Sequence, residues 1–459
     1  MTYMAPLLVV ALSLAAAVVV PAAGGGGGSF DFRGDLDHPY AGLSLSTHEV
    51  VRHGARASKA RAAWLTTKLA GALGGKRGDV SAADVRLAPL SDQAHSLTVG
   101  IGTPPQPRKL VVDTGSDLIW TQCKLFSRRR AASRQREPPL YDPSMSSSFA
   151  FLPCSSRLCQ EGQFSFKNCT DNNTCVYVDV YGSAAANGVL ASEAFTFGVH
   201  RAVSLRIGFG CGALSAGTLV GATGILGLSP ETLSLTTQLG IQRFSYCLTP
   251  FADRYTSPLL FGAMADLSKH ETTGPIQTTS LLSNPVETVY YYVPLVGISL
   301  GTRRLAVPAA SLAMRPDGSG GTIADSGSTL AYLVEPAFEA VRKAVMDAVK
   351  LPVANRTVED YELCFALPRR TGTAAAMEAV QVPPLVLHFD GGAAMVLPRD
   401  NYFQEPRAGL MCLAVAKMAT DGGGPGVSII GNVQQQNMHV LFDVRNQKFS
   451  FAPTHCDQI

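Results

Sequence analysis

Charged residues are scarce in this chain: Asp, Glu, Lys and Arg make up 16% of its 459 residues, whereas hydrophobic residues make up 46%. Disordered chains show the opposite balance, so the composition indicates a folded protein, long enough for two or three domains. Helical periodicity is also scarce, and its clearest stretch runs from Glu335 to Val349. The 44 Gly and 28 Pro are spread along the chain, as is typical of short strands joined by tight turns. We therefore expect a mostly β protein.

Long apolar runs are absent apart from one near the N-terminus, from Ala5 to Val20. This run ends in small residues, which is typical of a signal peptide cleaved near Ala22 or Ala23, and we predict that residues 1–23 are removed. The positive charge ahead of the run is weak, so a retained membrane anchor is the alternative. No arginine precedes Arg33, which argues against a chloroplast transit peptide. Without a second apolar run or a hydrophobic C-terminal tail, we expect no stable membrane association after cleavage.

The ten cysteines, an even number, fit passage through the secretory route, where disulfides form. Three Asn-X-Ser/Thr sequences offer acceptors for glycosylation at Asn168, Asn172 and Asn355, although such short sequences also occur by chance. These features predict a secreted glycoprotein with disulfide bonds.

Residues 24–89, called the prosegment below, differ from the rest of the chain. They begin with a run of glycines, and Ser46 to Glu49 (STHE) is typical of a capping box that opens a helix. The basic residues of that helix are Arg52, Arg56, Lys59, Arg61 and Lys68. One interpretation is a solvated basic helix, weakened by Gly54. The other is a propeptide whose cations occupy an acidic cleft until the carboxylates there are protonated.

The net positive charge of the chain comes from this N-terminal part. Residues 1–89 contain nine Lys/Arg and six Asp/Glu, and residues 90–459 contain 29 of each. A nearly neutral mature chain argues against nucleic acid as the main partner. One local exception is the arginine-rich stretch from Lys124 to Arg136, which we interpret as an exposed loop, with a basic docking patch or a site of proteolytic nicking as the alternatives.

The phrase Asp-Thr/Ser-Gly-Ser occurs twice, at 113–116 and at 325–328, and each copy follows an apolar run. Two apolar residues and a glycine come later in each half, at 225–227 and at 429–431. A chain that repeats a carboxylate on a tight glycine turn in this way is expected to form two similar lobes that face each other.

Two carboxyl groups brought together form a site for acid–base chemistry. Asp113 and Asp325 would not both ionise easily, so they would share one proton over a wide pH range. The ionised carboxylate can take a proton from water as the water attacks a peptide carbonyl, while the protonated one donates to the carbonyl oxygen. Gly115 and Gly327 permit the tight backbone behind each carboxylate.

Hydroxyl groups flank both aspartates. Thr114 and Ser326 would lock the two turns together, and Ser116 and Ser328 would donate to the outer carboxylate oxygens. One Asp-Thr-Gly triplet is weak evidence, but two copies with matching later elements are specific.

These phrases resemble those of the pepsin-type aspartic proteases, most closely the nepenthesin-like plant group. The resemblance extends from about Val99 to Cys456 and is carried by IGTPPQ (101–106), DTGSDLIWTQC (113–123), GFGCG (208–212), FSYC (244–247), DSGSTLAYL (325–333) and GNVQQQN (431–437). It implies an all-β, bilobal pepsin-like fold with an active-site cleft between two β-rich lobes. The implied parts are a propeptide at 24–89, an N-terminal lobe at 90–270 and a C-terminal lobe at 271–459. No metal and no cofactor are implied.

The family pattern also implies a flap, a hairpin that closes over substrate. Its tyrosine would be Tyr181, followed by Gly182, with Trp120 pairing beneath the tyrosine. The alternative for Trp120 is an ordinary core indole. Family members usually carry Asp-Gly-Ser after this Tyr-Gly, whereas this chain continues with Ser183 to Asn187 and is one residue shorter. Weakened or altered peptide binding is therefore a hypothesis for this chain.

The same resemblance suggests how the cysteines pair, although the sequence alone leaves the connectivity open. Two cysteines that nepenthesin-like chains usually carry after Cys123 are absent here. By analogy the expected pairs are Cys154–Cys175, Cys159–Cys169, Cys247–Cys456, Cys364–Cys412 and, with the two that remain, Cys123–Cys211.

The leading hypothesis is a secreted acid endopeptidase made as a zymogen, a monomer acting on protein or peptide substrates. Its expected location is extracellular, in the cell wall space, with the vacuole as the alternative. The competing hypothesis is a non-catalytic pepsin-like binding protein, such as an inhibitor of glycoside hydrolases, since a fold does not by itself fix a function. Both aspartates and all flanking hydroxyls are intact, and this favours the enzyme.

Overall fold

The computed structural model describes most of the chain. The described residues are 31–37, 46–73, 95–126, 139–181, 184–198, 203–216, 219, 221–251, 255–355, 358, 360–368, 377, 379–419 and 426–459. Their helices are α1 (Thr47–Leu73), α2 (Arg157–Glu161), α3 (Leu235–Gln238), α4 (Ala309–Leu312) and α5 (Glu335–Ala348). The helix expected from Glu335 onward is thus present as α5. The predicted signal peptide and its cleavage site lie outside the described residues.

One 15-stranded sheet extends through most of the molecule, in the order β13-β27-β26-β11-β12-β1-β2-β3-β10-β4-β9-β8-β7-β6, with β5 paired to β8. Its strands are β1 (Arg33–Asp37), β2 (Ser96–Ile101), β3 (Gln106–Asp113), β4 (Trp120–Gln122), β5 (Ala150–Phe151), β6 (Phe166–Cys169), β7 (Cys175–Tyr181), β8 (Ala184–Phe197), β9 (Val203–Ala216), β10 (Gly224–Gly227), β11 (Arg243–Cys247), β12 (Ser257–Phe261), β13 (Gln277–Ser280), β26 (Met438–Asp443) and β27 (Lys448–Pro453).

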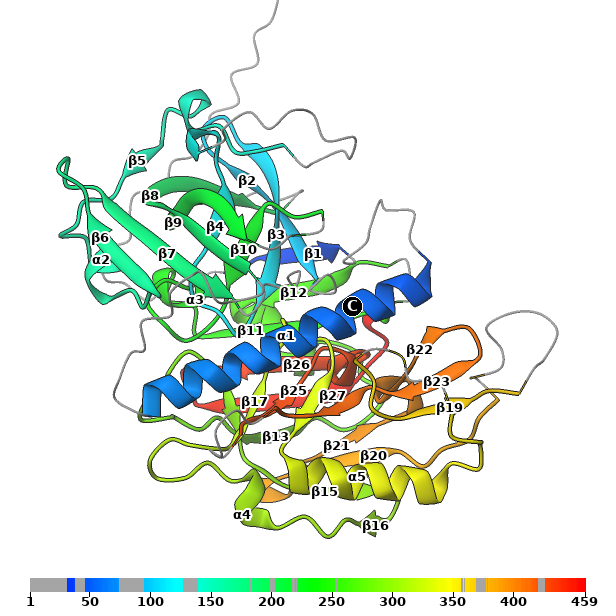
Figure 1. Ribbon diagram of the computed structural model, residues 1–459. Coiled ribbons are helices and arrows are strands. Elements are labelled where there is room, and N and C mark those ends of the chain that lie inside the picture. Colours follow the sequence, from blue (N-terminus) through cyan, green and yellow to red (C-terminus); the bar gives the residue numbers. More distant parts are fainter. Residues whose placement is uncertain are drawn as a thin grey trace, which may run out of the picture.

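Three smaller sheets follow in the second half of the chain, with the orders β14-β17-β25-β18-β24, β16-β15-β20-β21 and β19-β23-β22. Their strands are β14 (Tyr292–Val293), β15 (Leu295–Leu300), β16 (Arg303–Arg304), β17 (Thr322–Ala324), β18 (Ala331–Leu333), β19 (Cys364–Ala366), β20 (Leu385–Phe389), β21 (Ala394–Leu397), β22 (Phe403–Arg407), β23 (Leu410–Leu413), β24 (Val415–Lys417) and β25 (Ser428–Ile430). Figure 1 shows the result: two β-rich lobes with α1 lying across the boundary between them. The all-β, two-lobed expectation is confirmed.

The repeat seen in the sequence is a repeat of topology. In the first lobe β10 runs parallel to β3, so that Gly227 lies opposite Asp113, and β10 pairs antiparallel with β4. In the second lobe β25 runs parallel to β17 and antiparallel to β18. The later apolar elements are therefore the strands that support each aspartate. Glycine is required at Gly227 because a Cβ there would lie 2.5 Å from the backbone carbon of Asp117.

The prosegment contributes a strand to the main sheet. β1 lies between β12 and β2 and pairs antiparallel with both. Phe32, just before β1, stacks on Phe261 with 4.2 Å between ring centroids, and Leu36 is buried. Part of the predicted propeptide is thus integrated into the body of the fold.

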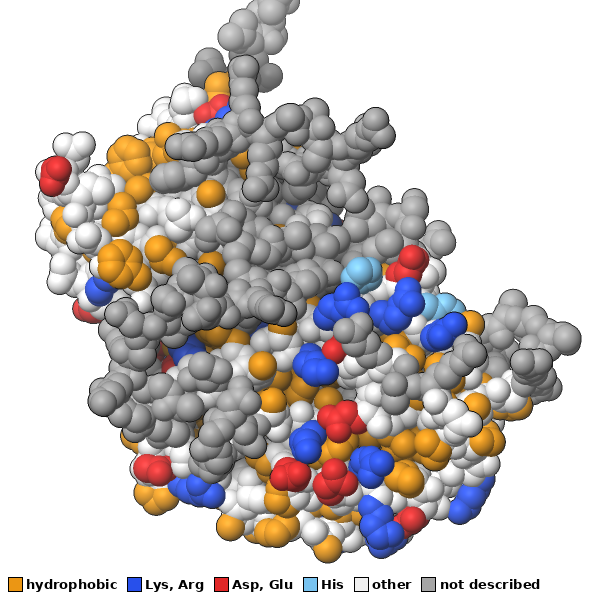
Figure 2. All heavy atoms as spheres, viewed as in Figure 1, with side chains coloured by type: hydrophobic (Ala, Val, Ile, Leu, Met, Phe, Trp, Pro, Cys, Tyr) orange, Lys and Arg blue, Asp and Glu red, His pale blue; other side chains and the backbone are white. Residues whose placement is uncertain are grey.

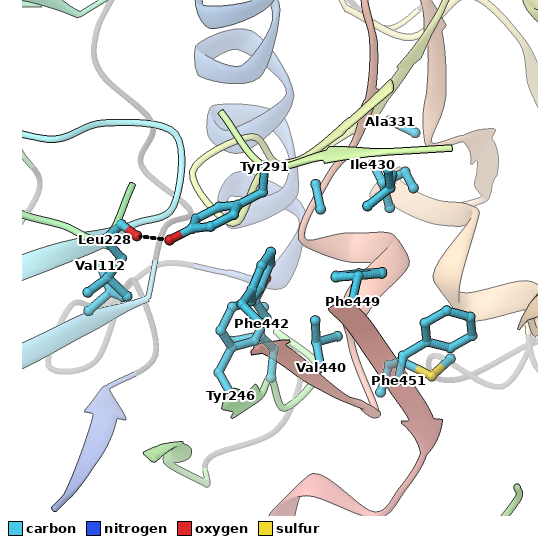
Figure 3. Close-up of a cluster of buried hydrophobic side chains, with 14 of the residues drawn as sticks. Val112, Leu228, Tyr246, Tyr291, Ala331, Ile430, Val440, Phe442, Phe449 and Phe451 are labelled. Carbon is cyan, nitrogen blue, oxygen red and sulfur yellow. Dashed lines mark hydrogen bonds between the residues drawn. The ribbon is translucent and has the colours of Figure 1, made fainter. Parts of the chain in front are cut away.

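A continuous apolar core lies below the junction of the lobes (Figure 3). Phe442 stacks on Phe244 with 4.9 Å between centroids, and Tyr291 packs against Phe442 at 4.6 Å. The Tyr291 hydroxyl donates a 2.7 Å hydrogen bond to the carbonyl of Leu228, directly after β10. This bond ties the second lobe to the strand that supports Asp113.

Five disulfides are present, and two of the expected pairs are wrong. Cys154 is bonded to Cys169 and Cys159 to Cys175, rather than Cys154 to Cys175 and Cys159 to Cys169. Burial explains this pairing: Cys159 and Cys175 are both buried in one apolar cluster, whereas Cys169 is exposed. The observed pairs are 15 and 16 residues apart and the expected pairs 21 and 10, and sequence separation alone excludes neither arrangement. The other three expected pairs are present: Cys123–Cys211, Cys247–Cys456 and Cys364–Cys412.

Within the described part of the chain, we find no helix with both the length and the apolar character needed to cross a membrane.

Replacing Tyr291 by Phe should lower the free energy of unfolding by about 1–2 kcal/mol, because the buried carbonyl of Leu228 loses its hydrogen bond from the phenol. Chemical denaturation of the full-length protein measures this value. Tyr255, which is exposed, gives the control Tyr255→Phe, for which we expect no change. Equal stability of Tyr291→Phe and the wild type would show that this bond between the lobes adds nothing.

Candidate active site

The two aspartates of the repeated phrase meet at the junction of the lobes. Asp113 is the last residue of β3, and Asp325 directly follows β17. Their exposed fractions are 1% and 0%. The two turns approach so closely that a Cβ on Gly115 would lie 2.7 Å from Oδ1 of Asp325, and one on Gly327 would contact Oδ1 of Asp113. Only glycine therefore fits at these two positions.

Each carboxylate is held by the same pair of donors from its own turn. The backbone N–H of Gly115 donates to Oδ1 of Asp113 at 2.9 Å, and Ser116 Oγ donates to Oδ2 at 2.7 Å. In the second lobe the N–H of Gly327 and Ser328 Oγ make the equivalent bonds to Asp325, at 2.9 and 2.6 Å. Such bonds favour the ionised form of a carboxyl group.

The hydroxyls of Thr114 and Ser326 lock the turns together, as the sequence led us to expect. Ser326 N–H donates to Thr114 Oγ1 at 2.9 Å, and Thr114 N–H donates to Ser326 Oγ at 3.2 Å. Ser326 Oγ also lies 3.4 Å from the carbonyl of Val112, in the opposite lobe. These reciprocal bonds fix the distance between the two carboxylates.

Arg61 of α1 fills the space between the carboxylates. Its Nη1 and Nη2 donate to Oδ2 and Oδ1 of Asp113 at 3.0 and 2.7 Å. Its Nε and Nη2 donate to Oδ2 and Oδ1 of Asp325 at 2.8 and 3.0 Å. All four carboxylate oxygens therefore accept a hydrogen bond from one guanidinium, whose side chain is 8% exposed.

The charges of these groups depend on one another. Burial disfavours the charged form of Arg61, but Asp113 and Asp325 outweigh this effect and raise the pKa of the guanidinium. Burial raises the pKa of Asp325 above its ordinary value; Arg61 opposes this shift and Asp113 adds to it. The negative charge of the site can thus be compensated in part by one arginine, or by protons when that arginine is absent.

The remainder of α1 docks mainly on the second lobe. Its N-terminus has the expected capping box, in which Ser46 N–H donates to Glu49 Oε2 at 2.9 Å and Glu49 N–H donates to Ser46 Oγ at 3.3 Å. One turn before Arg61, the fully buried Ser58 Oγ accepts from the backbone N–H groups of Thr329 and Leu330, both at 3.0 Å. The backbone amides of Thr329 and Leu330 therefore hold α1 next to the Asp325 turn.

Basic side chains of α1 also face acidic groups of the second lobe near β19 and β22. Lys59 lies 3.4 Å and Arg56 4.0 Å from the carboxylate of Asp360, which is 6% exposed. His48 lies 3.8 Å from Glu405. Figure 2 shows Lys, Arg and His side chains gathered over the end of α1 that lies toward β22. The propeptide interpretation of the basic helix fits this geometry, whereas a solvated helix does not.

The expected flap is present as the β7–β8 hairpin, in which Tyr181 lies opposite Ala184. The rings of Tyr181 and Trp120 stack with 6.2 Å between centroids. The indole Nε1 is buried and has no hydrogen-bond partner within the described ranges, so Trp120 is not a fully satisfied core indole. Gly182 and Ser183, at the flap tip, lie outside the described residues.

The remaining predictions concern the glycosylation acceptors, the arginine-rich stretch and metal binding. Asn168, Asn172 and Asn355 are all exposed, as glycosylation requires, and their modification is a prediction. Of the arginine-rich stretch, residues 127–138 lie outside the described residues. Among the residues that are described, no group of three or more His, Cys, Asp and Glu side chains is arranged to hold a metal ion.

The sequence included Arg61 among five basic residues but did not single it out. A signal was available, because the buried positions of α1 follow a helical stripe through Ala55, Ser58, Ala62 and Leu65. Arg61 is the basic residue within that stripe, whereas Arg52, Arg56 and Lys59 are exposed. The tertiary structure was needed to identify the backbone N–H groups that donate to Ser58 and the acidic partner of Lys59.

Comparison with known proteins gives matches across most of the chain. The family described as "Xylanase inhibitor N-terminal" matches residues 95–263, and "Xylanase inhibitor C-terminal" matches residues 290–453. The chain is 39% identical to aspartic proteinase nepenthesin-1 of Nepenthes gracilis over 369 residues, covering 80% of this chain and 78% of that relative. It is 34% identical to nepenthesin-2 of the same species over 426 residues, with 92% and 90% covered. The fold is similar to that of basic 7S globulin from soybean, with a TM-score of 0.61, 17% identity, and 80% and 96% covered.

Replacing Ser58 by Ala should weaken the docking of α1, because two buried N–H groups, of Thr329 and Leu330, lose their acceptor. We expect amide hydrogen exchange across α1 to rise roughly fivefold or more at neutral pH, as a loss of about 1–3 kcal/mol implies. Mass spectrometry of the exchanged full-length protein measures this. The exposed Arg52 gives the control, Arg52→Ala; if both variants exchange like the wild type, Ser58 does not anchor the helix.

Proposed function

Since the chain belongs to the pepsin-type aspartic proteases, in their nepenthesin-like plant group, we propose that it is the precursor of a secreted acid endopeptidase that hydrolyses peptide bonds with Asp113 and Asp325. One observation carries the proposal: two buried carboxylates with matching donors face each other across the lobes, and a removable cation lies between them. Because both carboxylates have matching donors, they suit a reaction in which each acts in turn as proton acceptor and proton donor.

The chemistry follows from this geometry once Arg61 has left. A water molecule bound between the carboxylates gives a proton to the ionised one as its oxygen attacks the peptide carbonyl. The protonated carboxyl donates to the carbonyl oxygen, so the tetrahedral intermediate forms without an uncompensated charge. As the C–N bond breaks, the carboxyl that took the proton from water gives it to the leaving nitrogen, and the other carboxylate takes a proton from a hydroxyl of the intermediate, whose oxygen becomes the carbonyl of the new carboxylic acid. The dyad ends with one proton, as it began.

In the precursor, Arg61 blocks this chemistry because it occupies the position of the water and donates hydrogen bonds to both carboxylates. Acid protonates the two carboxylates, so the buried guanidinium no longer faces a negative charge. Its transfer from the buried site to water then becomes favourable. Full release also requires β1 to leave the main sheet, where it pairs with β2 and β12. Inhibition would therefore be lost in two steps: α1 leaves the cleft, and β1 leaves the main sheet.

The setting of the enzyme forms part of the same proposal. We infer removal of residues 1–23 as a signal peptide, an extracellular location in the cell wall space or else in the vacuole, and glycosylation at the three exposed sequons. Protein or peptide substrates and a monomeric state complete the proposal.

A second candidate is a binding protein that inhibits glycoside hydrolases, because the family descriptions that match both lobes name xylanase inhibitors. The shortened flap sequence is compatible with this function. The complete set of donors around both aspartates favours the protease, because a binder does not need them. A purified, processed protein that leaves peptides intact but inhibits a fungal or bacterial xylanase would establish the second candidate.

Asp113→Asn and Asp325→Asn should each reduce peptide cleavage by at least 10³-fold at about pH 3–5, because either change removes a proton acceptor or donor. The measurement is cleavage of a fluorogenic peptide by acid-processed protein, with and without pepstatin. Since the variants cannot process themselves, the prosegment is removed from them by a second protease. Activity that survives in either variant, at unchanged fold by circular dichroism, would refute the dyad.

Arg61→Gln should shift acid activation of the full-length precursor upward by roughly one pH unit or more. The docked state is stabilised by ionised carboxylates facing Arg61, so removing its charge lets the helix leave before they are fully protonated. One unit corresponds to about 1.4 kcal/mol, less than the cost expected when one partner of a buried ion pair is removed, about 3–5 kcal/mol. The readout is the fraction of precursor processed at each pH. Lys59→Gln removes an exposed charge and should shift the midpoint far less; equal midpoints for Arg61→Gln and wild type would contradict the inhibitory role.

A further inference from the structure

A mostly buried carboxylate of the second lobe faces two cations of α1. Asp360 precedes β19, and its side chain is 6% exposed. Lys59 Nζ lies 3.4 Å from its Oδ1, and Arg56 Nε lies 4.0 Å from its Oδ2. The side chains of Lys59 and Arg56 are themselves 64% and 49% exposed. The acid therefore belongs to the wall of the lobe, whereas both cations reach it from the prosegment and leave with it.

The turn that carries Asp360 is held by contacts within the second lobe. The next residue, Tyr361, is buried, and its hydroxyl donates a 2.7 Å hydrogen bond to Oε1 of Gln404 on β22. The residue after it, Glu362, accepts a 2.8 Å hydrogen bond at Oε1 from the backbone N–H of Lys417 on β24. Neither bond involves α1, so the carboxylate of Asp360 keeps its position when the helix leaves.

Two further features distinguish this carboxylate. The backbone of Asp360 has a φ of 78°, in the left-handed region that residues other than glycine seldom adopt, and uncommon conformations of this kind are concentrated at functional sites. Within the described ranges, no basic side chain of either lobe lies within 4.0 Å of the carboxylate. Once α1 has left, the carboxylate thus lacks a counter-ion, and a cation that enters the cleft would supply one.

We propose that Asp360 forms a subsite of the mature enzyme that binds a lysine or arginine side chain of the substrate, in the place that Lys59 and Arg56 hold in the precursor. This inference rests on the proposed protease function and adds its substrate class: peptides with a basic residue at one defined position near the scissile bond. One carboxylate offers one counter-charge, so we expect the preference at a single position.

The position of α1 limits how far that residue lies from the scissile bond. Arg61 marks the dyad, and Lys59 and Arg56 precede it by two and five residues, about 3 and 7.5 Å along the helix axis. An extended peptide advances about 3.3 Å per residue, and a lysine or arginine side chain adds its own length. The basic residue should therefore lie within about four residues of the scissile bond.

Docking of the prosegment does not by itself require this site. Ser58 and Arg61 already hold α1 through buried contacts. Ion pairs whose cations are as exposed as those of Lys59 and Arg56 generally contribute little to stability. A mostly buried acid on an uncommon turn is better explained by a cation that is covered by the rest of its ligand, as the side chain of a bound peptide would be.

The test compares pairs of fluorogenic peptides that differ by Lys against Met, two unbranched side chains, at each of the four positions on either side of the scissile bond. Acid-processed enzyme is assayed at about pH 5.5, because aspartates in contact with water are ionised above about pH 5. For the wild type we expect one position at which kcat/KM for Lys exceeds that for Met by at least about threefold. The difference should appear mainly in KM, because this contact adds binding without taking part in the proton transfers.

Asp360→Asn should bring this ratio near one. Asparagine keeps the shape of the side chain and is enriched in the left-handed region, so the turn is preserved. Cleavage of Met peptides by this variant, at whatever rate, shows that it is folded. The matched control is Glu339→Gln, which removes an exposed charge from α5 in the same lobe and should keep the wild-type ratio.

Three results would overturn the inference, and the first two leave the protease function intact. Wild-type enzyme that cleaves Met peptides and shows no preference for Lys at any position would mean that Asp360 serves only the prosegment. An Asp360→Asn variant that keeps the full preference would assign the specificity to other groups. If processed wild type shows no pepstatin-sensitive cleavage of any peptide, the protease function itself is wrong, and this inference fails with it.

Discussion

The contact between Arg61 and the two aspartates is the interaction on which the rest of the structure depends. Four hydrogen bonds join three segments that are far apart in the sequence: the prosegment helix, the end of β3 and the turn after β17. Two buried carboxylates repel each other, and a buried guanidinium alone is costly, but together the three groups satisfy one another. The cleft is therefore stable in a closed, occupied form.

The dyad itself is built by repeating one local design. In each lobe an aspartate lies at the end of a strand or directly after it, a parallel strand supports it, and a turn supplies one amide and one serine hydroxyl to the carboxylate. Thr114 and Ser326 then bond across the junction, so each lobe positions the other. Preorganised donors of this kind hold reacting groups without needing to rearrange during the reaction. The symmetry of the parts explains how either carboxyl can act as acid or base.

The helix α1 also marks the surface that a substrate would meet. Its buried stripe places Ser58 on the amides of Thr329 and Leu330 and Arg61 on the dyad. Each contact neutralises or satisfies a group that would face water or substrate after the helix has left. The prosegment thus covers the polar groups of the cleft one by one, and the strand β1 secures it to the main sheet.

The sequence by itself determined the two-lobed β fold, the paired Asp-Thr/Ser-Gly turns, the capping box of α1 and the hydroxyls that lock the dyad, because each depends on short-range pattern and residue type. Only the tertiary structure decided which cation of α1 enters the dyad and how Cys154 and Cys159 pair. The reason is physical. These outcomes depend on burial and on contacts between segments from different parts of the chain, which local sequence patterns do not specify.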